Sequence, residues 1–226
     1  MEKFVIEGGR PLYGEIEIQS AKNAVLPLLA ASVLTEERIV IHNCPRITDV
    51  LNMAQILEEL GCRTSFTDGA LTVDPSDAAN HEIPAALAKE LRSSVFMLGS
   101  VLSRFGRARI AYPGGCDIGL RPIDLHLDGL RMLAAVKAEG TTVIRNAAKE
   151  PEIADLQNFV NRMGGRISGG GSSTVVVEGV KSLHGAEYTP VSDRIEAGTF
   201  LIASAMCGGE LVLKNARAEK LSALLD

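Results

Sequence analysis

The stretch 28–43, LLAASVLTEERIVIHN, joins an apolar segment with helical spacing to a short β-type run that ends in asparagine. The same pattern returns at 133–146, LAAVKAEGTTVIRN, with its asparagine 103 positions after the first. A third copy covers 200–215, FLIASAMCGGELVLKN, and a weaker fourth copy covers 94–112. Self-similarity of this kind indicates a fold that is built from repeated modules.

The residues after the first copy extend the module. Apolar side chains at helical spacing predict an amphipathic helix, which Gly61 ends: Val50, Met53, Ile56, Leu57 and Leu60. Two β-type runs follow, 62–66 and 71–73, and Asp68-Gly69 between them is typical of a tight hairpin. The module is therefore helix, strand, helix, strand, strand. Gly169-Gly170-Gly171 occupies the hairpin position of a later copy, so it indicates a turn and not a phosphate loop.

The module that begins with the copy at 94–112, which is second in chain order, departs from this arrangement. Its second helix, 123–133, should lead to a hairpin, yet 133–136 already belongs to the first helix of the next module. We therefore expect one hairpin and one strand to be missing near Ala134. Either the protein has lost this piece of its sheet, or the sequence is incomplete at that point.

Composition narrows the class of protein. The chain has 226 residues, of which 46% are hydrophobic and 23% charged, with a net charge of −5. This predicts a soluble globular protein without the basic field that nucleic acid or anionic lipid requires. The longest apolar stretch, 24–34, is too short to span a membrane. Four cysteines without a CxxC pair, and a start that does not resemble a signal peptide, predict a cytoplasmic protein. His42 and Cys44 lack the second close pair of a structural zinc site.

The loop 113–126, PGGCDIGLRPIDLH, has the strongest chemical character. Three glycines surround Cys116, and Pro122 at an expected helix start leaves backbone N–H groups free for an anion. Arg121 would favour the thiolate. The alternative is that Cys116 is only a small side chain in a glycine-rich turn. These residues favour neither interpretation over the other.

Two further cations precede apolar helices. Lys22, followed by Asn23, stands before the first helix, and Arg92 stands at the same place in the next module. A cation at a helix start opposes the helix dipole, which favours a bound anion there, although a solvated surface side chain is the alternative. Parallel packing of the modules would bring Lys22, Arg92 and Arg121 to one edge.

With these residues assembled, the chain resembles the enolpyruvyl transferases, and among them the UDP-N-acetylglucosamine 1-carboxyvinyltransferases. The resemblance rests on these motifs: LYG (12–14), SAKNA (20–24), LRSS (91–94), PGGC to RPIDLH (113–126), EGTT (139–142), NAAKEPEI (146–153) and DRIEAGTF (193–200). The cysteine loop with its Arg-Pro end is the most specific, because enzymes that act on shikimate 3-phosphate lack it.

The resemblance implies an inside-out α/β barrel fold with two domains. Residues 22–190 would form the first domain, with the gap near Ala134, and residues 1–21 and 191–226 would be parts of a second. The family chain is about twice as long, so most of the second domain is expected to be absent after Asp226. The gap would also remove a Ser-Val-Gly nucleotide-binding motif of the family.

The resemblance also implies the chemistry. Phosphoenolpyruvate and UDP-N-acetylglucosamine would be the ligands, without a metal or other cofactor, in the first committed step of peptidoglycan synthesis. Cys116 would donate a proton and Lys22 would act with it, while Arg92 and Arg121 hold phosphate and carboxylate. The UDP-sugar contacts would be Asn23, Arg121, Pro122, Ile123, Asp124 and Leu125. We expect little activity of this chain alone, and the alternative is a non-catalytic relative that binds a nucleotide sugar or a full-length partner. The residues do not specify an oligomeric state.

Overall fold

A computed structural model describes Val5, residues 7–112, Gly114 and residues 124–225, with the side chains of 124–127 and 222–223 left aside. Contacts between Cα atoms divide the chain into two compact units. One unit joins Met1–Gln19 to Ser192–Asp226, and the other is Ser20–Val191. No helix in the described part of the chain has the length and apolar character needed to cross a membrane.

The larger unit begins with a buried helix. This helix, α1 (Lys22–Ala31), continues into a 3-10 turn, η1 (Ser32–Leu34), and all its residues from Ala24 onward are buried, as expected for a helix that is apolar on all sides. The rest of the first module is β2 (Ile39–Ile41), α2 (Thr48–Glu59), β3 (Arg63–Thr67) and β4 (Ala70–Asp74). A late strand, β10 (Ala186–Tyr188), pairs in parallel with β2 and completes a four-stranded sheet in the order β10-β2-β4-β3.

Left-handed residues terminate the elements of the module. Asp68 and Gly69, at φ 50° and 74°, form the turn between β3 and β4, which matches the twist of a hairpin. The asparagines that end the repeated β-type runs are left-handed as well: Asn43, Asn146 and Asn215, at φ 48°, 55° and 59°. Asparagine tolerates this conformation better than most residues, which explains why the repeat ends in it.

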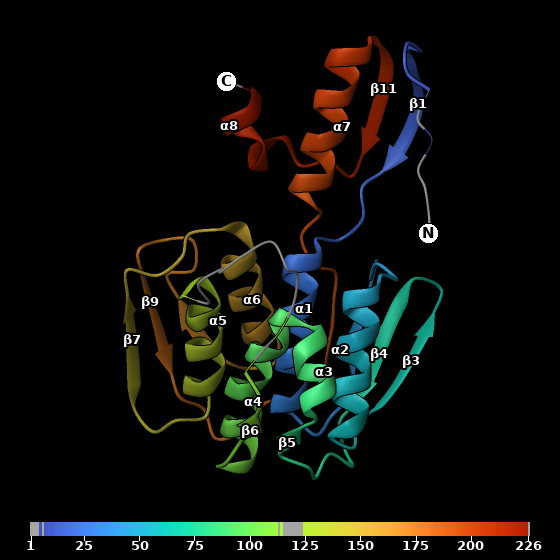
Figure 1. The fold of residues 1–226 in the computed structure, drawn as a ribbon. Coiled ribbons are helices and arrows are strands. Elements are labelled where there is room, and N and C mark those ends of the chain that lie inside the picture. Colours follow the sequence, from blue (N-terminus) through green and yellow to red (C-terminus); the bar gives the residue numbers. More distant parts are fainter. Residues whose placement is uncertain (1–4, 6, 113, 115–123, 226) are drawn as a thin grey trace. The chain divides into compact units, whose positions relative to one another are not determined.

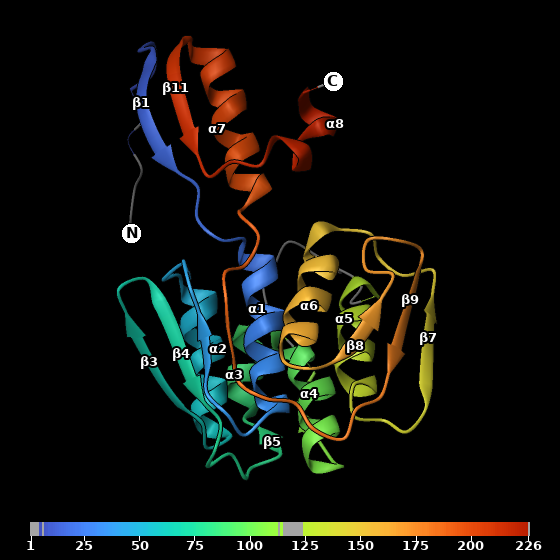
Figure 2. The same ribbon diagram turned by 180° about the vertical axis from the view of Figure 1, so that it is seen from behind.

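Two further sets of elements follow the first module. The second set contains β5 (Glu82–Ile83), α3 (Ala85–Glu90), a 3-10 turn η2 (Arg92–Ser94), α4 (Val95–Phe105), β6 (Arg109–Ile110) and α5 (Asp124–Ala135). The third contains β7 (Thr141–Arg145), α6 (Pro151–Arg162), β8 (Arg166–Ser168) and β9 (Thr174–Glu178). Figures 1 and 2 show the helices of this unit packed together, with the sheets on the outside.

The three sheets of the larger unit differ in completeness. The first has four strands, the second has only the parallel pair β5 and β6, and the third has the order β7-β9-β8. Within the described residues, the second sheet therefore has no hairpin and the third has no strand parallel to β7. In the described part of the chain, α5 is the helix that leads from the second set to the third, so one described helix stands where two modules meet.

The smaller unit is built on a strand pair and the helix α7. Its strands are β1 (Leu12–Glu17) and β11 (Gly209–Lys214), which pair in parallel, and α7 (Arg194–Cys207) is followed after β11 by a 3-10 turn η3 (Ala218–Lys220) and by α8 (Ser222–Leu225). Asp193 caps α7 by accepting hydrogen bonds from the N–H groups of Ile195 and Glu196 at 2.8 and 3.0 Å. Asp193, the first residue of the motif 193–200, thus stabilises the start of α7.

Candidate active site

Helices α1, α2 and α6 begin at the same end of the larger unit. The Nζ of Lys22 donates to Oδ2 of Asp49 at 2.8 Å, which joins the first turns of α1 and α2. Val191 joins α1 to α6, because its carbonyl accepts from the N–H of Ala21 at 2.8 Å and its N–H donates to Oδ2 of Asp155 at 3.1 Å. These links set three helix N-termini beside one another.

Helices α4 and α5 run in the same direction as α1. At the far end of α4, Arg104 donates to the carbonyl oxygens of Val33 and Thr35, at 3.0 and 2.5 Å, where α1 and η1 end. Gly99 of α4 lies so close to α5 that a Cβ there would stand 2.4 Å from the carbonyl oxygen of Leu130. All five helices therefore point their N-termini to one end, and Figures 1 and 2 show them side by side.

This end of the unit favours an anion. Among the described residues no side chain caps α1 or α6, and the first turn of α1 contains no acidic residue, whereas that of α6 contains Glu152. Uncapped N–H groups and the aligned helix dipoles provide partial positive charge at this end. Helix N-termini of this kind are suited to phosphate and carboxylate groups.

Lys22 and Asn23 open α1 at this end. Lys22 is partly exposed and makes its ion pair with Asp49, and Asn23 is exposed. The pair is open to solvent on both sides, so it contributes little stability and leaves the ammonium able to exchange partners. The structure thus places Lys22 and Asn23 together.

Arg92 lies in η2, immediately before α4. Its side chain is partly buried, and its Nη2 atom is buried with no hydrogen-bond partner among the described residues. At the start of α6, the Oε2 atom of Glu150 is also buried without a hydrogen-bond partner among the described residues. An unsatisfied buried polar group is costly, so these atoms are suited to a ligand that supplies the missing partners.

The cysteine loop is anchored where it begins. The N–H of Gly114 donates to the carbonyl oxygen of Ala88 at 3.0 Å, and the Oγ of Ser94, two residues after Arg92, donates to the same oxygen at 3.3 Å. A Cβ on Gly114 would stand 1.8 Å from the carbonyl oxygen of Lys89, so only glycine fits there. Cys116, Arg121, Pro122 and Ile123 lie outside the described residues, and Asp124 and Leu125 are described only as the first residues of α5.

Sequence reasoning missed the carboxylates that organise this end. Asp49 pairs with Lys22, and the buried Asp155 accepts from the hydroxyl of Tyr188 at 2.8 Å as well as from Val191. The repeat could have indicated Asp49, because Glu152 occupies the equivalent position, 103 residues later. Both acids stand in the first turn of their helices.

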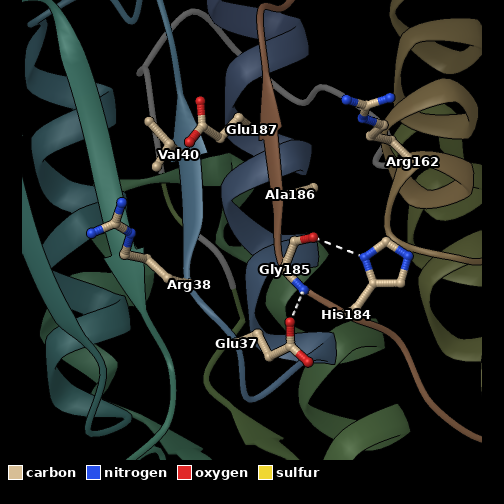
Figure 3. A pocket seen from close by; sticks show the side chains of 8 residues that line it. All are labelled: Glu37, Arg38, Val40, Arg162, His184, Gly185, Ala186 and Glu187. Atoms are coloured by element: carbon tan, nitrogen blue, oxygen red, sulfur yellow. Dashed lines mark hydrogen bonds between the residues drawn. The ribbon is translucent and has the colours of Figure 1, made fainter.

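A separate hollow lies at the opposite end of α6. It has a volume of about 610 Å³ and lies between β2, β10 and the last residue of α6, Arg162. Figure 3 shows its polar lining, where the N–H of Gly185 donates to Glu37 and the ring of His184 contacts the carbonyl oxygen of Gly185. Of the predicted site residues that the structure describes, none lines this hollow.

The described cysteines should differ sharply in reactivity. Burial raises the pKa of the thiols of Cys44 and Cys62 to about 12 and about 11, whereas Cys207 is exposed. Because the thiolate is the reactive form, we expect iodoacetamide to modify Cys207 at least ~100-fold faster than either buried cysteine in the folded protein. Mass spectrometry of timed digests measures these rates. Equal labelling of Cys44 and Cys207 before unfolding would contradict this assignment, and Cys207→Ser provides a background for labelling Cys116.

The fold defines a class of protein. The chain is similar to the enolpyruvyl transferase NikO from Streptomyces tendae, with a TM-score of 0.79 at 23% identity over 92% of this chain and 59% of that one. It is also similar to EPSP synthase from Acinetobacter baumannii, with a TM-score of 0.67 at 14% identity over 91% and 57% of the two chains. The chain therefore has the enolpyruvyl transferase fold, and the predicted fold class is confirmed.

Sequence comparison gives the family. The profile of EPSP synthase (3-phosphoshikimate 1-carboxyvinyltransferase) matches residues 6–135 and 131–226, and the chain belongs to this family. Similar proteins include UDP-N-acetylglucosamine 1-carboxyvinyltransferase 2 of Caldanaerobacter subterraneus, 48% identical over 100% of this chain and 63% of the relative. A UDP-N-acetylglucosamine 1-carboxyvinyltransferase of Thermotoga petrophila is 41% identical over 98% and 62%. The resemblance inferred from the motifs is thus confirmed.

The comparisons also bear on chain length. The chain spans about 63% of the length of the first of these relatives. That alignment has 264 positions against 226 residues of this chain, so at least 38 positions have no residue here. The profile matches in two parts that meet at 131–135, at the C-terminal end of α5.

Proposed function

We propose that this chain binds phosphoenolpyruvate and UDP-N-acetylglucosamine, and that it belongs to an enzyme that transfers the enolpyruvyl group to the 3-hydroxyl of the sugar with release of phosphate. The observation that carries the proposal is the Nη2 of Arg92, which is buried without a hydrogen-bond partner among the described residues, at the end of the unit where Lys22 begins α1. Relatives at 40–48% identity are named UDP-N-acetylglucosamine 1-carboxyvinyltransferase, which supports the proposal. The reaction would serve peptidoglycan synthesis, and so cell shape and division, in the cytoplasm.

The proposed roles follow from the charges that the reaction develops. In the addition step, the sugar hydroxyl would lose its proton and its oxygen would bond to C2 of phosphoenolpyruvate, while C3 gains a proton, for which Cys116 is our candidate donor. In the elimination step, C3 would lose a proton and the bond from C2 to the phosphate oxygen would break. Lys22, Arg92 and Arg121 would stabilise the departing phosphate. Asn23 and residues 121–125 would contact the UDP-sugar.

A second candidate function rests on the incomplete sheets. Within the described part of the chain, the second sheet has no hairpin and the third has no parallel strand, on either side of α5, where the family profile divides. We infer that a module of the family is interrupted here. The second candidate is therefore a relative that binds its ligands without turnover.

Phosphate release tests the second candidate. We expect this chain to release phosphate from the two substrates at least ~100-fold more slowly than a full-length relative, because misplacing catalytic groups costs about this factor. Release at a rate similar to that of the relative would contradict the binding-only candidate. Labelling of Cys116 by an epoxide phosphonate in the presence of the UDP-sugar tests the binding proposal itself. The absence of a mass increase on Cys116 in the Cys207→Ser background would count against a formed anion site.

A further inference from the structure

A buried carboxylate of α5 holds the segment that leads from β7 to α6. Asp128 lies in the second turn of α5 and is only 6% exposed. Its Oδ2 atom accepts a hydrogen bond from the N–H of Ala148 at 2.9 Å, and its Oδ1 atom accepts from Nη1 of Arg131 at 3.0 Å. Figures 1 and 2 show the segment running from β7 to α6 beside the first turns of α5. Asp128 thus joins α5 to the residues immediately before α6.

The contact with Ala148 explains why this carboxylate is buried. Removing a charged group from water is costly unless hydrogen bonds replace its hydration. Arg131 supplies one partner, but its side chain is 55% exposed, and an ion pair at this helical spacing forms on an exposed surface without burial. The backbone N–H of Ala148 is the partner that Asp128 reaches only by turning inward. Hydrogen bonds to a charged acceptor are stronger than those between neutral groups, so this one fixes the segment firmly.

The segment that Asp128 holds places Glu150 at the candidate site. The N–H of Ala147 donates to the carbonyl oxygen of Ser173 at 3.0 Å, and the next N–H, that of Ala148, donates to Asp128. Glu150 follows two residues later, directly before α6, where its Oε2 atom is buried without a hydrogen-bond partner among the described residues. The position of Glu150 therefore depends on two neighbouring backbone contacts, of which one is made by a side chain.

The same hydrogen bond crosses the junction in the family match. The profile matches residues 6–135 and 131–226, so Asp128 belongs to the first part alone and Ala148 to the second part alone. The predicted cysteine loop comes just before α5, and Glu150 comes just before α6. The bond therefore ties together two parts of the family module that both lead into the candidate site.

We propose that Asp128 is a positioning residue of the candidate active site, which fixes the segment 146–150 against α5 and so sets where Glu150 and the first turn of α6 lie. The identity of the ligand in this inference rests on the proposed function. Positioning and charge have opposite effects here. Removing a negative charge near an anion site strengthens the binding of an anion, whereas loosening the groups that shape the site weakens it.

Asp128→Ala tests the proposal in the full chain. We expect amide hydrogen exchange, followed by NMR, to become about tenfold faster at Ala148 and at Ile153, whose N–H donates to the carbonyl oxygen of Glu150 at 3.0 Å. We expect the affinity for phosphoenolpyruvate, measured by isothermal titration calorimetry, to fall about tenfold. Asp128→Asn should restore most of both values, because its amide oxygen still accepts from Ala148.

Two variants serve as controls. Arg131→Ala keeps the bond to Ala148 and should bind phosphoenolpyruvate like the unchanged protein. Asn161→Ala removes hydrogen bonds of the same kind, between a side chain and the backbone of Ile167, at the other end of α6, so it should lower the urea midpoint and leave the affinity unchanged.

Three results would overturn the proposal: unchanged exchange at Ala148 and Ile153 in Asp128→Ala, an affinity of this variant that equals or exceeds that of the unchanged protein, or an equal loss of affinity in Asn161→Ala. If the unchanged chain does not bind phosphoenolpyruvate, the proposed function fails. The exchange rates then decide by themselves whether Asp128 positions the start of α6.

Discussion

Replacing Arg92 with alanine is expected to weaken phosphoenolpyruvate binding by about 10- to 100-fold, since a hydrogen bond to a charged group contributes about 1.5–3 kcal/mol. The buried Nη2 of Arg92 has no partner among the described residues, so an anionic ligand would supply its hydrogen-bond acceptor. Isothermal titration calorimetry measures the change directly. Intrinsic tryptophan fluorescence is not an option, because the chain contains no tryptophan.

Two further variants are needed to interpret this change in affinity. Arg92→Lys keeps the charge but loses the planar fork that matches phosphate and carboxylate, so its affinity should lie between those of the unchanged protein and Arg92→Ala. Arg109→Ala is the matched control, because Arg109 is an exposed arginine that pairs with Glu82 at 3.5 Å. Equal affinities for Arg92→Ala and Arg109→Ala would remove Arg92 from the binding site.

The modules were predictable because their signals are local. Gly61 after α2, Asp68-Gly69 in the hairpin and Asn43 after β2 each require a left-handed backbone, and the sequence supplies a residue suited to it. The repeat then added nonlocal information, since three copies with the same ending indicated one architecture. The unusual character of the region around Ala134 was also visible, and there a single helix, α5, leads directly into β7.

The candidate site was predictable only in part. The cations at helix starts followed from sequence position, but the pairing of Lys22 with Asp49 joins residues 27 positions apart and depends on how α1 packs on α2. The burial of Arg92 could not be inferred either, because the position of an arginine before an apolar helix is equally consistent with a solvated side chain. Tertiary packing, and not local propensity, decides both features.

Phe159→Ala is expected to lower the free energy of unfolding by about 3–5 kcal/mol, a large part of the 5–15 kcal/mol that is typical of a folded protein. Phe159 lies on α6, is fully buried, and packs edge-on against the ring of Tyr188 with centroids 5.4 Å apart. Its removal leaves a cavity in the main core. Urea unfolding followed by circular dichroism measures the loss.

Tyr112→Ala provides the control, because Tyr112 is 79% exposed and its loss should shift the urea midpoint little. The loss of unfolding free energy in Phe159→Leu should lie between those of Phe159→Ala and Tyr112→Ala, since leucine fills most of the cavity.

The effect of Phe159→Ala should also reach the candidate site through a chain of hydrogen bonds. Tyr188 donates to Asp155, Asp155 accepts from the N–H of Val191, and the carbonyl oxygen of Val191 accepts from the N–H of Ala21 at the start of α1. Loss of the ring contact frees Tyr188, so hydrogen exchange at Ala21 should accelerate in Phe159→Ala and not in Tyr112→Ala. Unchanged exchange at Ala21 would show that the first turn of α1, and Lys22 with it, is held independently of this core.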